Sequence, residues 1–341
     1  MKPSGTHVLA GDIGGTKTVL SLSERAPDGS FREIATTTFA SGEHEGLEKP
    51  TAAFLDASGV RPVAAAFGVA GPVRNGQVRT TNLPWAIDAT SFASTLGISR
   101  VAVINDFEAT ARGLLMLGED ELVILQEGIV SPQGPIAVLG AGTGLGEAIL
   151  VRVGQDAIVL PTEGGHASFA PRNELEDGLL RFCRQQFPDH VSYERVLSGP
   201  GLETIHSFVQ SAGLAKSSET TLARLRTEDP GAVIGELGVS NQDPACALAL
   251  SLFASIYGSE AGNLALKTLP RGGLFVSGGI AAKILPALQR DDTFVQSFLA
   301  KGRMREVLST IRVSVVLEPH VALRGARTLA FQLHDSLLHD A

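Results

Sequence analysis

The feature that most constrains this chain is a pattern that occurs twice: an apolar run, a glycine-rich turn and a second apolar run. The first copy covers residues 8–22, with the turn Gly11-Asp-Ile-Gly-Gly-Thr16, and the second covers 135–153, with the turn Gly140-Ala-Gly-Thr-Gly-Leu-Gly146. Each apolar run is typical of a buried strand that stops at a tight turn. The repeat therefore predicts two related α/β domains whose turns face each other.

The first turn has the residue types of a phosphate site. Gly14 and Gly15 allow backbone N–H groups to approach an anion, and Thr16 adds a hydroxyl donor. Asp12 would repel an anion unless a metal ion lay between them, so a carboxylate at this position indicates a magnesium nucleotide. The alternative is an ordinary β-hairpin turn, because Thr18–Leu22 is typical of a second strand.

Two further glycine segments also follow predicted strands. Gly140–Gly146 is neither a dinucleotide-binding turn, since Leu145 replaces the last glycine, nor a Walker A loop. Together with the first turn it would hold a triphosphate from both sides. Gly278-Gly279 is predicted to precede a helix over 281–288 whose N–H groups face a nucleoside. The alternatives are a flexible surface turn and a strand–helix turn without a ligand.

Asn105 and Asp106 stand where the predicted strand Val101–Ile104 ends and a predicted helix over 107–117 begins. Open α/β sheets bind ligands at the C-terminal edge of their strands. Asp106 is therefore a candidate base for the proton of a hydroxyl, with Asn105 orienting that hydroxyl. The alternative is that Asp106 only caps the helix.

A second group of polar residues is predicted to lie on loops. Glu163-Gly-Gly-His166 is expected to be a tight loop, because its two glycines disfavour a helix. With Glu194 it offers the carboxylates and the imidazole that suit the hydroxyls of a polyol. A metal site is less favoured, since no second His or Cys is near in the sequence. The alternative for His166 is a loop histidine with local hydrogen bonds.

Charge and cysteine usage exclude several classes of partner. The chain of 341 residues has 28 Lys and Arg against 36 Asp and Glu, and its net charge of −8 argues against nucleic acid and membrane. Cys183 and Cys246 form no Cys-x-x-Cys pair, and the N-terminus lacks the apolar segment of a signal peptide, so we expect a cytoplasmic protein. The apolar stretch Ala245–Gly258 is shorter than the ~20 residues that span a bilayer and is expected to be a buried core helix.

Eight motifs between residue 8 and about residue 330 resemble, in their order and spacing, those of the bacterial hexokinase-type glucokinases, which have the actin/Hsp70/sugar-kinase fold. They are Gly11–Thr16, Gly71-Pro72, Asn82-Leu-Pro-Trp85, Asn105-Asp-Phe-Glu108, Gly140–Gly146, Glu163–His166, Glu194-Arg-Val-Leu-Ser-Gly-Pro-Gly201 and Gly278-Gly279. The resemblance implies a two-domain actin-like ATPase (ribonuclease H-like) fold with an interdomain cleft. It implies a small α/β domain over 1–107, a large α/β domain over 108–320, and a C-terminal helix at about 321–338 that packs back on the small domain.

The resemblance also implies the site residues. The equivalent of Asp106 is the catalytic base on the sugar 6-hydroxyl, and the equivalent of Asp12 reaches Mg²⁺ through water. The equivalents of the following residues hold glucose: Asn105, Asp106, Glu163, His166 and Glu194. The equivalents of the following residues bind ATP: Gly11, Asp12, Ile13, Gly14, Gly15, Thr16, Gly142, Thr143, Gly144, Gly278 and Gly279. Lys17 is assigned no role, because its position varies between related families.

The expected reaction is the phosphorylation of D-glucose by ATP, with closure of the cleft excluding water, in a homodimer whose partners are a sugar and a nucleotide. A related hexose kinase or a polyphosphate-dependent sugar kinase stays open as an alternative. A related family of repressors and sugar kinases is set second, because its Cys-rich zinc loop is missing here. A sugar-sensing regulator would be expected to carry a helix-turn-helix arm before residue 8. A chaperone-like or actin-like ATPase would lack the Asn105-Asp106 and Glu163/His166 set.

Overall fold

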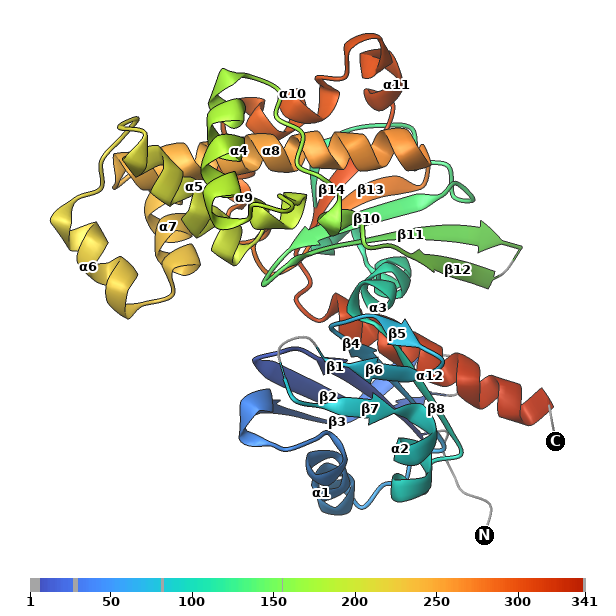
Figure 1. The fold of residues 1–341 in the computed structure, drawn as a ribbon. Coiled ribbons are helices and arrows are strands. Elements are labelled where there is room, and N and C mark those ends of the chain that lie inside the picture. Colours follow the sequence, from blue (N-terminus) through green and yellow to red (C-terminus); the bar gives the residue numbers. More distant parts are fainter. Residues whose placement is uncertain (1–6, 27–29, 81–82, 155, 340–341) are drawn as a thin grey trace. The chain divides into compact units, whose positions relative to one another are not determined.

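The computed structural model describes residues 7–26, 30–80, 83–154 and 156–339, so Asn82 of the motif quoted above lies outside the described residues. Its internal contacts divide into two units (Figure 1). Unit 1 comprises residues 1–117 and 320–341, and unit 2 comprises residues 118–319. The division differs from the expected boundary at residue 107, because helix α3 (Asp106–Gly113) packs with helix α12 (Val321–His339) in unit 1.

Unit 1 is built on a mixed five-stranded sheet in the order β3-β2-β1-β4-β8. Its strands are β1 (His7–Ile13), β2 (Lys17–Arg25), β3 (Phe31–Ala40), β4 (Ala64–Val69) and β8 (Arg100–Asn105). The first three pair antiparallel, while β4 pairs parallel with β1 and with β8. The central strand β4 is apolar and buried throughout, and β1 is apolar and buried from Val8 to Ala10, because both faces of these strands are covered.

One face of this sheet packs on α1 (Glu48–Ser58), α2 (Ala89–Leu96) and a small sheet, and the other packs on α12. The small sheet consists of β5 (Val73–Arg74), β6 (Gln77–Arg79) and β7 (Ala86–Asp88). Helices α3 and α12 touch backbone to backbone at two glycines. A Cβ on Gly113 would lie 1.9 Å from the oxygen of Val321, and one on Gly325 would lie 1.8 Å from that of Ala109.

Unit 2 contains a six-stranded sheet in the order β12-β11-β10-β13-β14-β9. The strands are β9 (Leu122–Gln126), β10 (Ile136–Ala141), β11 (Leu145–Val153), β12 (Asp156–Pro161), β13 (Gly273–Ser277) and β14 (Val313–Val316). Five of them, from β12 to β14, repeat the order and the strand directions of the sheet in unit 1. The predicted repeat of strand, turn and return strand is therefore confirmed.

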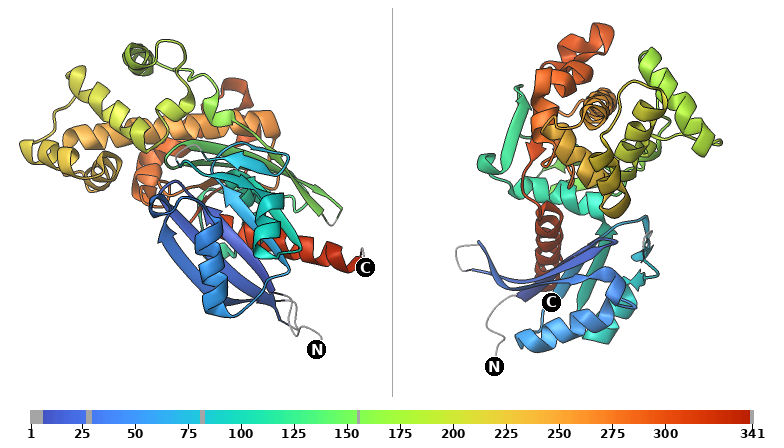
Figure 2. Two further views of the ribbon diagram at one scale, coloured as in Figure 1. Left: turned by 60° about the horizontal axis from the view of Figure 1, so that its bottom comes forward. Right: turned by 90° about the vertical axis from the view of Figure 1, so that its left-hand side faces the viewer.

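Unit 2 also contains the long helix α8 (Pro244–Thr268) and a group of shorter helices (Figure 2). They are α4 (Glu174–Gln186), α5 (Gly199–Ser211), α6 (Glu219–Thr227), α7 (Pro230–Val239), α9 (Leu285–Gln289), α10 (Thr293–Leu299) and α11 (Arg305–Leu308). By length and composition α8 is apolar enough to cross a membrane, yet 78% of its most apolar window is buried within the protein. The prediction of a buried core helix is thus confirmed.

Short 3₁₀ helices complete the structure. They are η1 (Ser41–Glu43), η2 (Leu114–Met116), η3 (Glu119–Glu121), η4 (Gly164–His166), η5 (Tyr193–Arg195), η6 (Arg290–Asp292) and η7 (Gly302–Met304). Two predicted helices have different bounds: the one expected over 107–117 ends at Gly113, and the one expected over 281–288 begins only at Leu285. Residues 278–284 form turns, and Pro286 lies in the first turn of α9, where proline favours the start of a helix.

Candidate functional site

The first glycine turn is a three-residue hairpin loop, residues 14–16, between the antiparallel strands β1 and β2. The N–H of Gly14 donates to the oxygen of Lys17 over 3.0 Å. The hydroxyl of Ser41 donates to the oxygen of Gly14 over 2.8 Å, and its N–H donates to that of Thr16 over 3.0 Å. Buried Ser41 thus holds the turn in shape, a role that no pattern around it in the sequence indicates.

Two carboxylates of unit 1 lie near Gly68 of β4, one of them on the strand that leads into this turn. Asp12 is half-buried at the end of β1, beside Gly68 of β4. Asp106 begins α3, and its Cα is 3.8 Å from where a Cβ on Gly68 would be. Burial, and after it the charge of Asp106, raise the pKa of Asp12 to about 6. Oxygen ligands at such a site suit Mg²⁺, since a divalent cation relieves the repulsion between them.

Asn105, rather than Asp106, caps α3. Its Oδ1 accepts from the N–H of Phe107 over 2.8 Å and from that of Glu108 over 3.4 Å. Its Nδ2 donates to the oxygen of Gly71 over 3.2 Å. Asp106 is the first residue of α3, and its Oδ1 accepts the N–H of the neighbouring Phe107 over 3.0 Å. The cap expected as the alternative role of Asp106 is therefore supplied by Asn105.

The second glycine turn is also a three-residue hairpin loop, Gly142-Thr143-Gly144, between β10 and β11. The N–H of Gly142 donates to the oxygen of Gly144 over 2.8 Å. Oε2 of Glu194 accepts the N–H of Leu145 over 2.9 Å, and a Cβ on Gly144 would lie 2.4 Å from the same oxygen. The carboxylate of Glu194 therefore lies directly against this turn.

Three separate segments meet at the end of β10. Gly278 has φ +88°, and a Cβ on it would lie 2.6 Å from the oxygen of Ala141. The N–H of Gly199 donates to the oxygen of Gly142 over 2.8 Å, and the hydroxyl of buried Tyr257 accepts the N–H of Ala141 over 2.9 Å. The structure thus brings Gly278-Gly279 to the second turn, although no helix begins at 281. Tyr257 lies far from this turn in the sequence, and no motif around it indicates the contact.

The two loops that carry the candidate polyol ligands lie side by side in unit 2. Glu163 precedes η4, His166 is its last residue, and both residues are exposed. The N–H of Tyr193, next to Glu194, donates to the oxygen of Ala167 over 2.9 Å. The predicted tight loop over 163–166 is one turn of 3₁₀ helix.

The candidate residues therefore form two half-sites, one in each unit. Unit 1 holds Gly11, Asp12, Ile13, Gly14, Gly15, Thr16, Asn105 and Asp106. Unit 2 holds Gly142, Thr143, Gly144, Glu163, His166, Glu194, Gly278 and Gly279.

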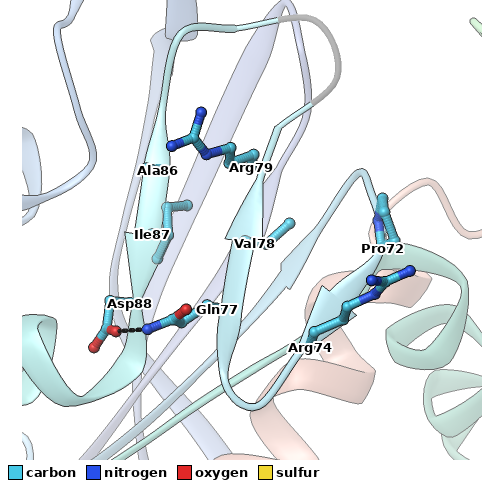
Figure 3. Close-up of a pocket in the computed structure, with 8 residues that line it drawn as sticks. All are labelled: Pro72, Arg74, Gln77, Val78, Arg79, Ala86, Ile87 and Asp88. Carbon is cyan, nitrogen blue, oxygen red and sulfur yellow. Dashed lines mark hydrogen bonds between the residues drawn. The ribbon is translucent and has the colours of Figure 1, made fainter.

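A separate hollow lies over the small sheet of unit 1 (Figure 3). Its lining residues are Pro72, Arg74, Gln77, Val78, Arg79, Ala86, Ile87 and Asp88. Nε2 of Gln77 donates there to Oδ2 of Asp88 over 2.6 Å. None of the residues in the two half-sites lines this hollow, so it is not the candidate active site.

Three side chains of unit 2 have the types of a metal site: His206, Asp243 and Cys246, whose ligand atoms lie within 4.8 Å of one another. However, Oδ1 of Asp243 already accepts the Ser217 hydroxyl and the N–H groups of Ala245 and Cys246. Burial, and after it the charge of Asp243, raise the pKa of the Cys246 thiol to about 12. A protonated thiol and a saturated cap indicate a structural network at the start of α8.

Comparisons with solved structures identify proteins of the same fold. A glucokinase from an Antarctic psychrotroph has a crystal structure that matches with a TM-score of 0.81 at 33% identity, over 96% of this chain and 99% of that one. A ROK family glucokinase from Streptomyces griseus, solved with glucose and AMPPNP, matches with a TM-score of 0.64 at 21% identity over 96% and 99%. The fold is therefore that of sugar kinases.

The sequence comparisons are more specific. The family model described as glucokinase matches residues 9–333. A glucokinase from a Nostoc species (strain PCC 7120) is 42% identical over 96% of this chain and 100% of its own length. The chain belongs to the glucokinase family.

Proposed function

We propose that the protein transfers the γ-phosphoryl group of ATP to the 6-hydroxyl of D-glucose, giving glucose 6-phosphate and ADP. Family membership supports glucose phosphorylation. The observation that carries the finer proposal is the pair of carboxylates in unit 1, with Asp12 beside the first turn and Asp106 at the C-terminal edge of the sheet. We also propose the two-domain actin-like ATPase fold, since the two sheets share their strand order.

Asp106 is proposed as the base. It stands at the end of β8, where parallel strands present ligands, and Asn105 fixes the start of the helix that carries it. A carboxylate in this place accepts the proton of the attacking hydroxyl as the phosphoryl group is transferred. Asn105 uses both ends of its amide within the protein, so we propose that it orients Asp106 and the Gly71 backbone as well as the sugar.

The phosphates of ATP are proposed to bind to the backbone N–H groups of the two glycine turns, and the nucleoside to bind at Gly278-Gly279. The hairpin geometry leaves glycine backbone with little side-chain cover in both turns. Asp12 would hold Mg²⁺ through water, and the ion would supply neutralisation of charge on the phosphates. The related kinase from Streptomyces griseus was solved with AMPPNP, which supports a nucleotide as the donor.

Glu163, His166 and Glu194 are proposed to bind the remaining hydroxyls of the sugar. Glu163 and His166 are exposed and can bind hydroxyls, and Glu194 has a second carboxylate oxygen besides the one that accepts the N–H of Leu145. The same Streptomyces griseus kinase was solved with glucose. The cytoplasmic location and the homodimer implied by the resemblance remain predictions.

The deciding experiment is the variant Asp106→Asn. We expect turnover of glucose to fall by about three orders of magnitude or more, because the base is lost, while equilibrium binding of glucose changes little. Asp56→Asn, on the exposed surface of α1, is the matched control for the loss of one carboxylate. Normal turnover by Asp106→Asn would contradict the assignment of the base.

A second variant tests the sugar half-site. Glu163→Gln is expected to raise the KM for glucose by about tenfold while the KM for ATP stays within about twofold, since only hydroxyl contacts are weakened. Equal effects on the two constants would place Glu163 elsewhere. The same coupled assay, run with ATP, polyphosphate and several hexoses, separates a glucokinase from a polyphosphate-dependent kinase. Absence of any hexose 6-phosphorylation would leave a sugar-sensing regulator as the function.

A further inference from the structure

Two glutamates of unit 2 are buried without an ion pair among the residues that the structure describes. Glu147 on β11 is 3% exposed and Glu260 on α8 is 0% exposed. In each of them Oε1 is buried and has no hydrogen-bond partner within the described part of the chain. Because burial of an uncompensated carboxylate is strongly unfavourable, two such oxygen atoms in one core require an explanation.

A proton shared by the two carboxyls supplies the missing partner of both oxygens. Burial, and after it the negative charge of Glu260, raise the pKa of Glu147 to about 8, while Lys267 opposes the shift. Burial also raises the pKa of Glu260, although hydrogen bonds and two lysines oppose it. Two close carboxyls in a buried site do not both ionise near neutral pH.

Several other charged or titratable groups face this pair. Those that act on one of the two carboxyls directly are Tyr193 of η5, Tyr257 and Lys267 of α8, and Lys301 after α10. The charges of Arg172 and Glu176 act on Lys301 in turn, and these two residues form an ion pair with each other. Lys301 also donates to Oδ1 of Asn263 over 2.6 Å and to Oγ of Ser259 over 3.1 Å. The lysine charges are therefore partly used by other groups and do not neutralise both carboxyls.

Glu147 touches the loop that carries Glu163 and His166. A Cβ on Gly164 would lie 1.9 Å from Oε2 of Glu147, so the loop passes directly over this carboxyl. The hydroxyl of Thr162 donates to the carbonyl of Glu147 over 3.2 Å and accepts the N–H of Gly164 over 3.2 Å. A shift of the Glu147 side chain would therefore move η4.

Glu260 is connected to the loop that carries Glu194. Nδ2 of Asn263 donates to Oε2 of Glu260 over 2.8 Å and to the hydroxyl of Tyr193 over 3.0 Å. Tyr193 precedes Glu194 and is 3% exposed, so its ring fixes the start of η5. The pair thus contacts both loops that bear the proposed sugar ligands of unit 2.

We propose that Glu147 and Glu260 share one proton and that this pair positions Glu163, His166 and Glu194 for sugar binding. Neither glutamate touches the sugar in this proposal; both are positioning residues, and the idea rests on the sugar-binding role proposed above. Loss of the shared proton places two negative charges side by side beneath η4. Repulsion between them would displace Gly164 and Tyr193, and the affinity for glucose would fall at alkaline pH.

The first measurement is the KM for glucose between pH 6 and pH 9.5. We expect it to rise about fivefold or more above pH 8 in the native protein, with a smaller change in kcat. In Glu147→Gln the amide still donates to Glu260 but cannot ionise, so this alkaline rise should disappear. Glu147→Ala removes the donor and should raise the KM at every pH. Equal pH profiles for the native protein and Glu147→Gln would overturn the proposal.

Glu236→Gln is the matched control, because this glutamate lies on the surface of α7 in an exposed pair with Arg224. It should retain the alkaline rise of the native protein. If the rise were lost in Glu236→Gln as well, the effect would reflect net charge and the proposal would fail.

Stability gives a readout that does not depend on catalysis. The pKa of Glu147 is about 8 in the folded protein against an ordinary value of 4.5. The proton therefore stabilises the fold fully below pH 4.5, and this contribution is lost as the pH rises toward 8. The Tm of the native protein, compared with that of Glu147→Gln, should fall over this interval, and an infrared band of a protonated carboxyl should be missing in the variant. If the native protein showed neither the fall in Tm nor the infrared band, the shared proton would be refuted. Inactivity on hexoses would refute only the proposed function.

Discussion

The two glycine turns have the same backbone design but differ in their carboxylates. Each is a three-residue loop between antiparallel strands at the same place in its sheet. The first turn has a carboxylate on its own strand, Asp12, whereas the second receives one from η5, Glu194. The repeat thus reproduces the backbone N–H groups, while the side-chain chemistry differs between the copies. Under the proposed function, the carboxylate beside the first turn serves Mg²⁺, whereas the carboxylate against the second turn serves the sugar.

The two turns are also held in place by different groups. Ser41 donates hydrogen bonds to two carbonyl oxygens of the first turn. The hydroxyl of Tyr257 accepts the N–H of Ala141, on the strand before the second turn. Neither contact is repeated in the other unit among the bonds described for these turns. Similar loops therefore depend on unrelated neighbours, and each can be disturbed separately.

The largest difference between the two turns is expected from the variant Asp12→Asn. We expect kcat to fall by about 100-fold or more, because the phosphates lose a water-mediated contact through Mg²⁺, with the KM for glucose within about threefold. Steady-state kinetics at several Mg²⁺ concentrations measures both constants. An unchanged kcat would show that the carboxylate of the first turn has no special role.

The next test compares two glycines of the second turn. Gly144→Ala places a methyl group 2.4 Å from Oε2 of Glu194, so we expect the carboxylate to move. The KM for glucose should then rise by about tenfold, since small displacements of a binding group are costly. Gly142→Ala is the matched control, because a Cβ there has no atom within 4 Å. Similar effects of the two substitutions would argue against a role of Glu194 at the sugar.

The smallest effects are expected from the supports of the turns. Ser41→Ala and Tyr257→Phe each leave a buried backbone group without a partner, which costs about 1–3 kcal/mol of stability. We expect the KM for ATP to rise about two- to fivefold in both variants, as each turn loses its shape. Chemical denaturation and ATP kinetics measure the two effects. A change confined to stability would mean that the turns keep their geometry without these contacts.

Much of the fold can be predicted from local patterns. Apolar runs that end at Gly11 or Gly140 identify the strands around both turns, and Asp243 followed by Pro244 identifies the start of α8. The bounds of α9 are less predictable, because several turn residues after Gly279 also suit a helix. The helix propensity of these residues does not reveal that the backbone at Gly278 packs on Ala141.

The candidate site is predictable only where its residues form motifs. Asn105-Asp106 can be found from the strand end, but the sequence does not show which of the two caps the helix, since both types are good caps. Ser41, Glu147 and Glu260 carry no local signal. Their roles depend on contacts between elements that are distant in the chain, which the order of residues alone does not reveal.

The close contact of α12 with α3 has a consequence for biosynthesis. Unit 1 consists of residues 1–117 and 320–341, so the ribosome completes unit 2 before α12 exists. Until then β1 and β4 lack the cover of Ala326, Ala330 and Phe331, and the strand that leads to the first glycine turn stays exposed. Because domains fold as units once their parts are available, unit 1 can complete its core only after α12 has been synthesised.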